Sequence, residues 1–198
     1  FVDRESQYGN LLKEAILKVD NIVAVSPTYS KEILTSVGGK GLDMVLKGRE
    51  DALLGILNGL DYTYWNPATD SHLAAQYSVK TLKKRHENKK ALWRRLSMEE
   101  TEDRPLVGCV TRLVPQKGIE LIKHALHQAY RLNYQMVLIC STHDPENTKV
   151  FHELQETFSK DLNIRLALSR DEDLAHMLFA ASDITIVPAL LEPCGLTQ

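Results

Sequence analysis

Two cations follow a predicted strand in the segment Thr111-Arg112-Leu113-Val114-Pro115-Gln116-Lys117-Gly118. The guanidinium of Arg112 is a planar fork of donors and the ammonium of Lys117 is a point charge, and together they suit a diphosphate. In that position they would stabilise the charge of a departing nucleoside diphosphate. The spacing fits two solvated loop cations equally well, so both interpretations stay open on the spacing alone.

The last heptad, Glu192-Pro193-Cys194-Gly195-Leu196-Thr197-Gln198, places an acid, a thiol and a glycine around a proline. The carboxylate of Glu192 could accept a hydrogen bond from a sugar hydroxyl or lie near developing positive charge; the alternatives are a salt bridge and a solvated acid. Gly195 would let the backbone approach a ligand closely. A helix after this loop would offer its N-terminal amides to an anion.

The elements that must position these loops alternate between strands and helices from Pro105 onward. Apolar β-branched runs predict strands at 106–110, 136–140, 164–168 and 184–187, the last of them buried. Helical spacing predicts helices over 118–132, around Val150 to Phe158 and around Leu174 to Phe179, with a capping box from Ser169 to Glu172. Helices of this length between strands imply a parallel, Rossmann-like sheet, so the loops after its strands should share one edge.

The segment before this sheet predicts the tail of a separate α/β unit over residues 1–57. Asn10 caps an expected helix from Leu11 to Val19, a short strand covers 22–25, a break at 26–29 is followed by another helix, and 38–41 is a flexible loop. Residues 58–70 are the expected interdomain hinge, in which Asn58-Gly59 fits a turn and Trp65 a packing role. Residues 71–198 form the second domain, with helices expected over 71–97.

The composition is that of an ordinary globular protein, with 198 residues, 43% hydrophobic and 25% charged residues and a net charge of −2. This balance gives no electrostatic case for nucleic acid, and we interpret the basic run between Lys80 and Arg95 as a solvated helix face rather than a polyanion site. No apolar stretch approaches the length of a membrane span. The question of whether a targeting segment precedes Phe1 stays open.

The cysteines, the histidines and the known sequence motifs give no sign of a disulfide framework, a metal site or another enzyme class. Three cysteines cannot all pair, and Cys109 and Cys140 lie in apolar runs, which predicts core positions and a reducing compartment. The histidines form no metal-ligand pattern, and His176 is expected to be structural. Dinucleotide, P-loop and hydrolase-elbow motifs do not occur, which weighs against those enzyme classes.

Five motifs of the chain stand out together: Val25 to Tyr29, Gly55 to Asp61, Trp65 to Asp70, Thr111 to Leu113 with Gln116 to Gly118, and Glu192 to Gln198. In this order they resemble the bacterial and plant glycogen and starch synthases, which are retaining glucosyltransferases of the GT-B fold. The resemblance implies an α/β fold of partial GT-B type. The tail of an N-terminal Rossmann-like domain would be followed by the first half of a C-terminal, nucleotide-binding one.

The resemblance also implies an activity, which is transfer of glucose from ADP-glucose or UDP-glucose to the non-reducing end of an α-1,4-glucan without metal or cofactor. Arg112 and Lys117 would hold the diphosphate and Glu192 would lie against the donor sugar. Arg170 stands where the family often has an aromatic residue that stacks on the base. The remaining substrate-binding positions are expected at Asn58, Cys194, Gly195, Leu196 and Thr197.

The expected partners are a nucleotide-sugar donor and an α-glucan acceptor, but neither nucleic acid nor a membrane, with the oligomeric state left open. The location would be the cytoplasm in a bacterium and the plastid stroma in a plant. Another GT-B enzyme is an alternative that the last heptad disfavours. A non-catalytic fragment that binds nucleotide sugar or glucan is a second alternative, and we expect this chain alone to be inactive and to bind nucleotide sugar poorly.

Overall fold

A computed structural model describes residues 10–198, and the first nine residues of the predicted first domain lie outside that part. The described chain forms two compact units, one reaching up to Leu60 and the other comprising Asp61–Glu192. The border after Leu60 falls inside the expected hinge at 58–70, and a hinge function for that segment stays a prediction.

The last six residues, Pro193–Gln198, group with the first unit instead of continuing the expected domain 71–198. A side chain of the first unit explains this grouping, because the hydroxyl of Ser26 donates a hydrogen bond of 2.7 Å to the carbonyl of Pro193. The same hydroxyl accepts the amide of Tyr29 at 2.9 Å and thereby caps a helix that already begins at Pro27, so the expected break at 26–29 is wrong from Pro27 onward.

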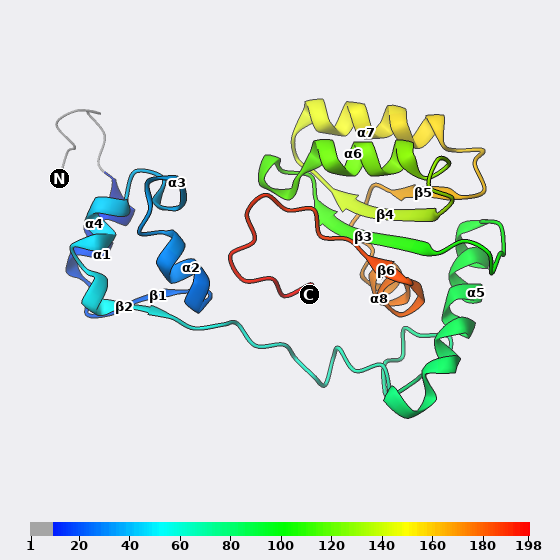
Figure 1. The fold of residues 1–198 in the computed structure, drawn as a ribbon, viewed down its shortest axis with the longest axis horizontal. Helices are drawn as coiled ribbons and strands as arrows, with labels where there is room; N and C mark the ends of the chain where they lie inside the picture. The colour runs from blue at the N-terminus through cyan, green and yellow to red at the C-terminus, as the bar shows by residue number, and fades with distance from the viewer. Residues whose placement is uncertain (1–9) are drawn as a thin grey trace. The chain divides into compact units, whose positions relative to one another are not determined.

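The first unit is a two-stranded parallel sheet with short helices (Figure 1), as expected from the tail of an α/β unit. Asn10 caps the first helix by accepting the amide of Lys13, as the sequence predicts. Among the described residues of this unit, the buried apolar side chains are Ile16, Ala24 and Leu46. Its elements are α1 (Leu11–Lys18), β1 (Ile22–Ala24), α2 (Pro27–Glu32), α3 (Ser36–Gly39), α4 (Asp43–Lys47), η1 (Glu50–Ala52) and β2 (Leu53–Gly55).

The expected flexible loop at 38–41 is wrong in its first half, because Gly38 and Gly39 end the short helix α3. The hydroxyl of Thr35 caps this helix by accepting the amide of Gly38 at 3.1 Å. Lys40 then adopts a left-handed conformation with φ of 51° and ends the helix. A local cap therefore outweighs the low helix propensity of the two glycines.

The second unit is an all-parallel four-stranded sheet in the order β5-β4-β3-β6 (Figure 1), which confirms the predicted Rossmann-like arrangement. The expected helices over 71–97 are confirmed only from residue 79 onward. Its elements are η2 (Val79–Lys84), α5 (Arg85–Leu96), β3 (Leu106–Arg112), η3 (Pro115–Lys117), α6 (Ile119–Gln128), β4 (Gln135–Ser141), α7 (Pro145–Thr157), β5 (Ile164–Ala167), α8 (Glu172–Ala181) and β6 (Ile184–Thr185).

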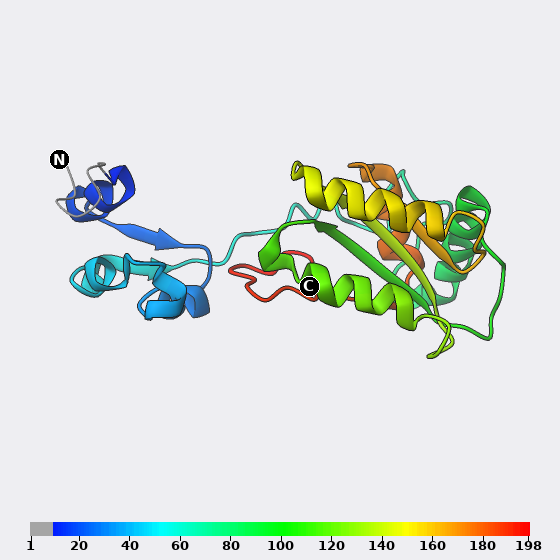
Figure 2. The same ribbon diagram turned by 90° about the horizontal axis from the view of Figure 1, so that it is seen from above.

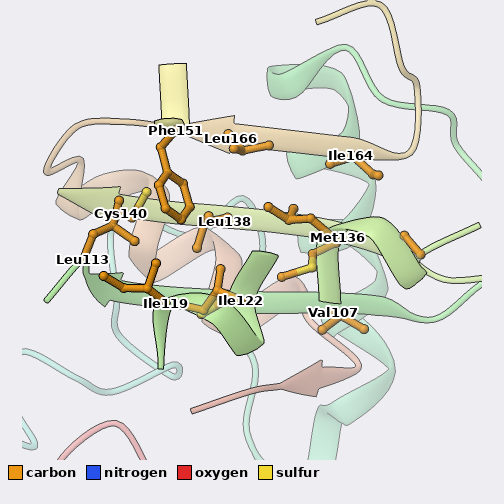
Figure 3. Close-up of a cluster of buried hydrophobic side chains, with 13 residues drawn as sticks. Val107, Leu113, Ile119, Ile122, Met136, Leu138, Cys140, Phe151, Ile164 and Leu166 are labelled. Atoms are coloured by element: carbon orange, nitrogen blue, oxygen red, sulfur yellow. The ribbon is translucent and has the colours of Figure 1, made fainter. Parts of the chain in front are cut away.

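Helices cover both faces of this sheet, α6 and α7 on one face and α5 and α8 on the other (Figure 2). Alternation along β4 builds the two cores, because side chains of successive strand residues point to opposite faces. Met136 and Leu138 pack under α6 and α7 beside Ile122 and Phe151 (Figure 3), whereas Val137 lies in the core formed with α5 and α8.

Two predicted details of the sheet are wrong. The last strand is short and exposed at Ile184 and Thr185, because β6 pairs only with β3 and occupies an edge of the described sheet. The cap of α8 is Asp171, whose carboxylate accepts the amide of Leu174 at 2.8 Å, and not the expected Ser169. Aspartate and serine cap about equally well, so the sequence pattern did not separate the two.

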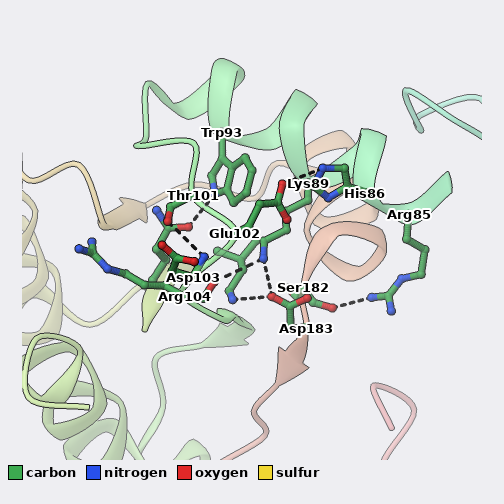
Figure 4. Close-up of polar contacts among 12 residues, drawn as sticks. Arg85, His86, Lys89, Trp93, Thr101, Glu102, Asp103, Arg104, Ser182 and Asp183 are labelled. Carbon is green, nitrogen blue, oxygen red and sulfur yellow. Dashed lines mark hydrogen bonds and ion pairs between the residues drawn. The ribbon is translucent and has the colours of Figure 1, made fainter. Parts of the chain in front are cut away.

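The basic run on α5 is only partly a solvated face. Lys89 is 7% exposed, and its ammonium contacts the carboxylate of Asp183 at 2.7 Å, so the solvated interpretation is wrong for this residue. Asp183 also accepts the amide of Leu106 at 2.7 Å. The guanidinium of Arg85 donates to the carbonyls of Ala180 and Ser182 at the end of α8 (Figure 4), which ties α5 to the amino edge of the sheet.

Candidate functional site

The strand order creates a switch point between β3 and β6. From β3 the chain continues through β4 to β5 on one side, and then returns to place β6 on the other side of β3. In open α/β sheets, ligands bind outside the carboxyl ends of the strands at such a point. The segments that follow the two strands, residues 112–118 (the cationic loop) and 186–192 (the acidic loop), therefore flank the expected crevice.

The cationic loop is held by its own backbone and by one core side chain. Leu113 is 1% exposed and extends the pairing with β4, because its amide donates to the carbonyl of Ser141 at 2.8 Å. Pro115 starts a single 3₁₀ turn, which the amide of Lys117 closes on the carbonyl of Val114 at 2.8 Å. The turn fixes the backbone position from which the lysine side chain projects.

Gly118 joins this turn to α6 in a conformation that favours glycine, with φ of 70°. A Cβ atom at this position would collide with the carbonyl oxygen of Pro188 in the acidic loop. The absence of a side chain at Gly118 therefore allows the two loops to approach each other closely.

Backbone hydrogen bonds join the two loops beside that contact. The carbonyl of Gln116 accepts the amide of Leu190 at 2.8 Å and the amide of Leu191 at 3.3 Å. Both donors immediately precede Glu192, so its main-chain position is set by the cationic loop.

Lys117 and Glu192 meet at the end of this backbone junction. The ammonium nitrogen lies 2.5 Å from Oε2 of the carboxylate, and the side chains are 17% and 25% exposed. The two loops meet at one edge of the sheet, as the parallel topology predicts, whereas a pocket shared by them stays a prediction. Of the roles left open for Glu192, the structure shows a salt bridge. Arg112 is exposed at the end of β3 and has no ion pair among residues 10–198.

The other predicted site residues are distributed over both units. Arg170 is exposed in the segment between β5 and α8, directly before the helix cap. Asn58 is exposed in the first unit, and Cys194, Gly195, Leu196 and Thr197 belong to that unit as well. Gly195 has a φ of 78° and its carbonyl accepts the amide of Gln198. The substrate-binding roles of these residues stay predictions.

Two residues that organise the site were not found from the sequence. Ser26 holds the carbonyl of Pro193, and Gln116 holds the amides of the acidic loop through its own carbonyl. A serine before a proline signals a helix cap but not a second, distant partner. Gln116 acts through its backbone, so its side-chain type carries no signal.

His176 has the structural role that the sequence predicts. Its ring is 2% exposed, its Nδ1 lies 2.6 Å from a carboxylate oxygen of Asp70, and it stacks on Trp65 with ring centroids 3.8 Å apart. These contacts fasten the start of the second unit to α8, and they confirm the packing role expected for Trp65.

Other chemistries find little support in the described residues. Burial raises the pKa of Cys109 to about 12 and, together with the neighbouring Cys109, that of Cys140 to about 12, so both thiols are protonated core residues. Within residues 10–198 no three His, Cys, Asp or Glu side chains are grouped in a way that could hold a metal ion. In that same part, no helix is both long and apolar enough to cross a membrane.

Family comparisons match both parts of the chain. Residues 3–48 match the family model described as the starch synthase catalytic domain. Residues 95–198, more than half of the chain, match the model described as glycosyl transferases group 1.

Two curated relatives align over nearly the whole chain. The chain is 46% identical over 190 residues to "Probable starch synthase 4, chloroplastic/amyloplastic" of Arabidopsis thaliana, covering 96% of this chain and 18% of that protein. It is 43% identical over 199 residues to a glycogen synthase of Protochlamydia amoebophila, covering 96% of this chain and 40% of that protein. The chain thus spans two fifths or less of the length of these relatives.

A solved structure of a starch synthase is similar to this chain in fold as well as in sequence. The catalytic domain of starch synthase IV from Arabidopsis thaliana, described as bound to ADP and acarbose, superposes with a TM-score of 0.91 at 46% identity, covering 94% of this chain and 38% of that one. The fold is therefore part of a GT-B fold, as the motifs imply. The chain belongs to the group 1 glycosyl transferases, and its resemblance to the glycogen and starch synthases is confirmed.

Proposed function

We propose that the protein carrying this sequence transfers glucose from a nucleotide sugar to the non-reducing end of an α-1,4-glucan, with retention at the anomeric carbon. The observation that carries the proposal is the 46% identity over 94% of the chain to a starch synthase catalytic domain described as bound to ADP and acarbose. ADP-glucose is the preferred donor in this proposal, and UDP-glucose is the alternative.

At the carboxyl edge of the sheet, different residues would contact the diphosphate, the sugar and the base of the donor. Arg112 and Lys117 would bind the diphosphate and stabilise its growing negative charge as the bond to glucose breaks. Glu192 would accept a hydrogen bond from a hydroxyl of the donor sugar. Arg170 would lie against the base through its planar guanidinium.

The proposal places further contacts on the first unit. Asn58 would contact the substrates, and the segment Cys194, Gly195, Leu196 and Thr197 would surround the sugar and the distal phosphate. The site of action would be the plastid stroma in a plant and the cytoplasm in a bacterium, since the relatives include a chloroplast protein and bacterial proteins.

A chimera tests the proposal. The sequence replaces the corresponding region of the Protochlamydia amoebophila glycogen synthase, and incorporation of labelled glucose into glycogen is measured with ADP-glucose and UDP-glucose. We expect transfer, and a fall in kcat of about 100-fold or more for Arg112→Ala and for Lys117→Ala, because each removes a cation from a developing anion.

Lys123→Ala is the matched control, since it removes a lysine from the neighbouring helix α6, where it pairs with Glu120. It should leave kcat within about twofold, as expected for a surface ion pair. Binding of ADP without transfer would favour the non-catalytic alternative. Equal kcat in all variants would leave Arg112 and Lys117 as ordinary loop cations.

A further inference from the structure

We propose that Glu192 is an internal anion that occupies the phosphate-binding position on Lys117, and that a nucleoside diphosphate must displace it in order to bind. The inference rests on the proposed function and adds a competition to it. The donor-free protein would keep one of its two phosphate-binding cations neutralised by its own carboxylate.

The ion pair is close and partly removed from water. The 2.5 Å separation and the low exposure of both side chains mean that solvent and salt screen the attraction weakly. Among residues 10–198 the structure gives the ammonium of Lys117 no other polar partner, and the same holds for the carboxylate of Glu192. Each group therefore depends on the other, and neither is fixed by additional bonds.

The backbone holds the two side chains opposite each other. The carbonyl of Gln116 keeps two amides of the acidic loop beside the cationic loop, and Gly118 admits the carbonyl of Pro188. Separation of the pair therefore needs only rotation of the two side chains, not movement of the loops. An incoming phosphate can exchange with the carboxylate at the cost of one ion pair.

The charges of the two loops determine which ligand can make this exchange. Arg112, Lys117 and Glu192 are the only ionisable side chains in them. Arg112 has no ion pair in the described part and is available to one phosphate group. A second phosphate gains a strong contact only by taking Lys117 from Glu192, so the competition weakens the binding of a diphosphate and leaves that of a monophosphate, which needs only Arg112, nearly unchanged.

Displacement would also prepare the sugar site. Once the phosphate holds Lys117, the carboxylate of Glu192 has lost its partner and can accept a hydrogen bond from a hydroxyl of the donor sugar. Binding of the diphosphate and release of Glu192 are then two sides of one equilibrium, which the ligand shifts by its differential affinity.

Affinity measurements on the whole 198-residue chain test the competition, by NMR titration with ADP and with AMP. Glu192→Gln keeps the shape of the side chain and removes its charge, so it should tighten ADP binding about fivefold or more and change AMP binding less than about twofold. Lys117→Gln should weaken ADP binding, and adding Glu192→Gln to it should bring no further gain.

Glu120→Gln is the matched control, because it removes an acid from the first turn of α6 that pairs with Lys123 instead. A gain in Glu120→Gln as large as that in Glu192→Gln would overturn the proposal, since it would reflect overall charge alone. ADP binding in Glu192→Gln that is equal to the wild type, weaker or undetectable would overturn it as well. Glu192→Ala should also tighten ADP binding, as Glu192→Gln does.

The proposed function fails independently of this inference. Glucosyl transfer by the chimera together with unchanged ADP affinity in Glu192→Gln rejects the competition alone. Tighter ADP binding in Glu192→Gln without any transfer rejects the enzyme activity and leaves the competition in place.

Discussion

The second unit has a lysine–carboxylate pair at each edge of one sheet, and the two pairs are built differently. At the amino edge, Lys89 and Asp183 lie 2.7 Å apart, and each has a further partner: the lysine reaches the carbonyl of Arg104 and the carboxylate accepts the amide of Leu106. At the carboxyl edge, Lys117 and Glu192 have only each other within residues 10–198.

The number of additional bonds separates a structural pair from an exchangeable one. A buried ion that also satisfies backbone groups cannot leave without orphaning them, and an orphaned buried group costs free energy. In a pair that is held by side chains alone, an anionic ligand can take the place of the carboxylate on the lysine. We therefore expect the amino-edge pair to stabilise the fold and the carboxyl-edge pair to serve ligand exchange.

The largest effect is expected at the amino edge. Lys89→Met keeps most of the apolar volume but removes the ammonium, and it should lower the free energy of unfolding by about 2–3 kcal/mol. This lies below the usual cost of breaking a buried pair, because the Asp183 side chain is 44% exposed and partly solvated. Urea unfolding of the two proteins measures the difference.

Lys117→Met is the matched control for that variant and should cost only about 1 kcal/mol, because no backbone group loses a partner. The comparison fails if the two methionine variants are equally destabilised.

Gly118→Ala tests the contact between the two loops. Its φ of 70° is unfavourable for alanine by about 1–2 kcal/mol, and the added methyl group also meets Pro188. Gly118→Asn separates the two causes, since asparagine tolerates this conformation better but keeps the Cβ atom. Thermal unfolding should therefore rank glycine above asparagine and asparagine above alanine; equal melting temperatures would contradict the close contact.

Acidification should weaken the amino-edge pair. Burial by itself raises the pKa of Asp183, but hydrogen bonds from the amide of Leu106 and from Lys89 outweigh it and leave the pKa below the usual 3.8. The native carboxyl thus binds a proton less readily than the unfolded one. Its contribution to stability is present above pH about 4 and is lost as the pH falls through the lowered native pKa.

Urea midpoints between pH 6 and pH 2 check this expectation. The wild type should lose more stability on acidification than Asp183→Asn, and the difference between them should shrink as the pH falls. If the urea midpoints of the two proteins changed with pH in parallel, protonation of Asp183 would not be linked to folding.

The smallest effect is the stability coupling of the carboxyl-edge pair itself. A double-mutant cycle with Lys117→Gln and Glu192→Gln should give a coupling of about 0.5–1 kcal/mol for unfolding, as for other partly exposed pairs. A coupling above about 3 kcal/mol would make this pair structural and remove the distinction between the edges.

Periodicity predicted most of the second unit, because its core alternates regularly. Met136 and Leu138 face one layer of helices while Val137 faces the other, and such runs indicate a doubly covered strand. The run at β6 is also mostly apolar, yet Ile184 is 49% exposed. An apolar run does not reveal whether both faces of a strand are covered.

The candidate site was predictable in its charges but not in its connections. Arg112, Lys117 and Glu192 stand out as cations and an acid after strands, and parallel topology brings their loops to one edge. The carbonyl of Gln116 and the fit of Gly118 against Pro188 are backbone contacts, which residue types do not encode. Lys89 was missed because it stands in a run of exposed lysines and arginines, where only the fold shows that it is buried.

The short strand β6 also bears on the order in which the site assembles. It contributes two paired residues, and the chain between it and β3 forms β4 and β5. Closing a long loop costs more entropy than closing a short one, and a strand with few paired residues opens at a low free energy. The acidic loop follows β6 directly, so mild heating should release Glu192 from Lys117 while most helices are still folded.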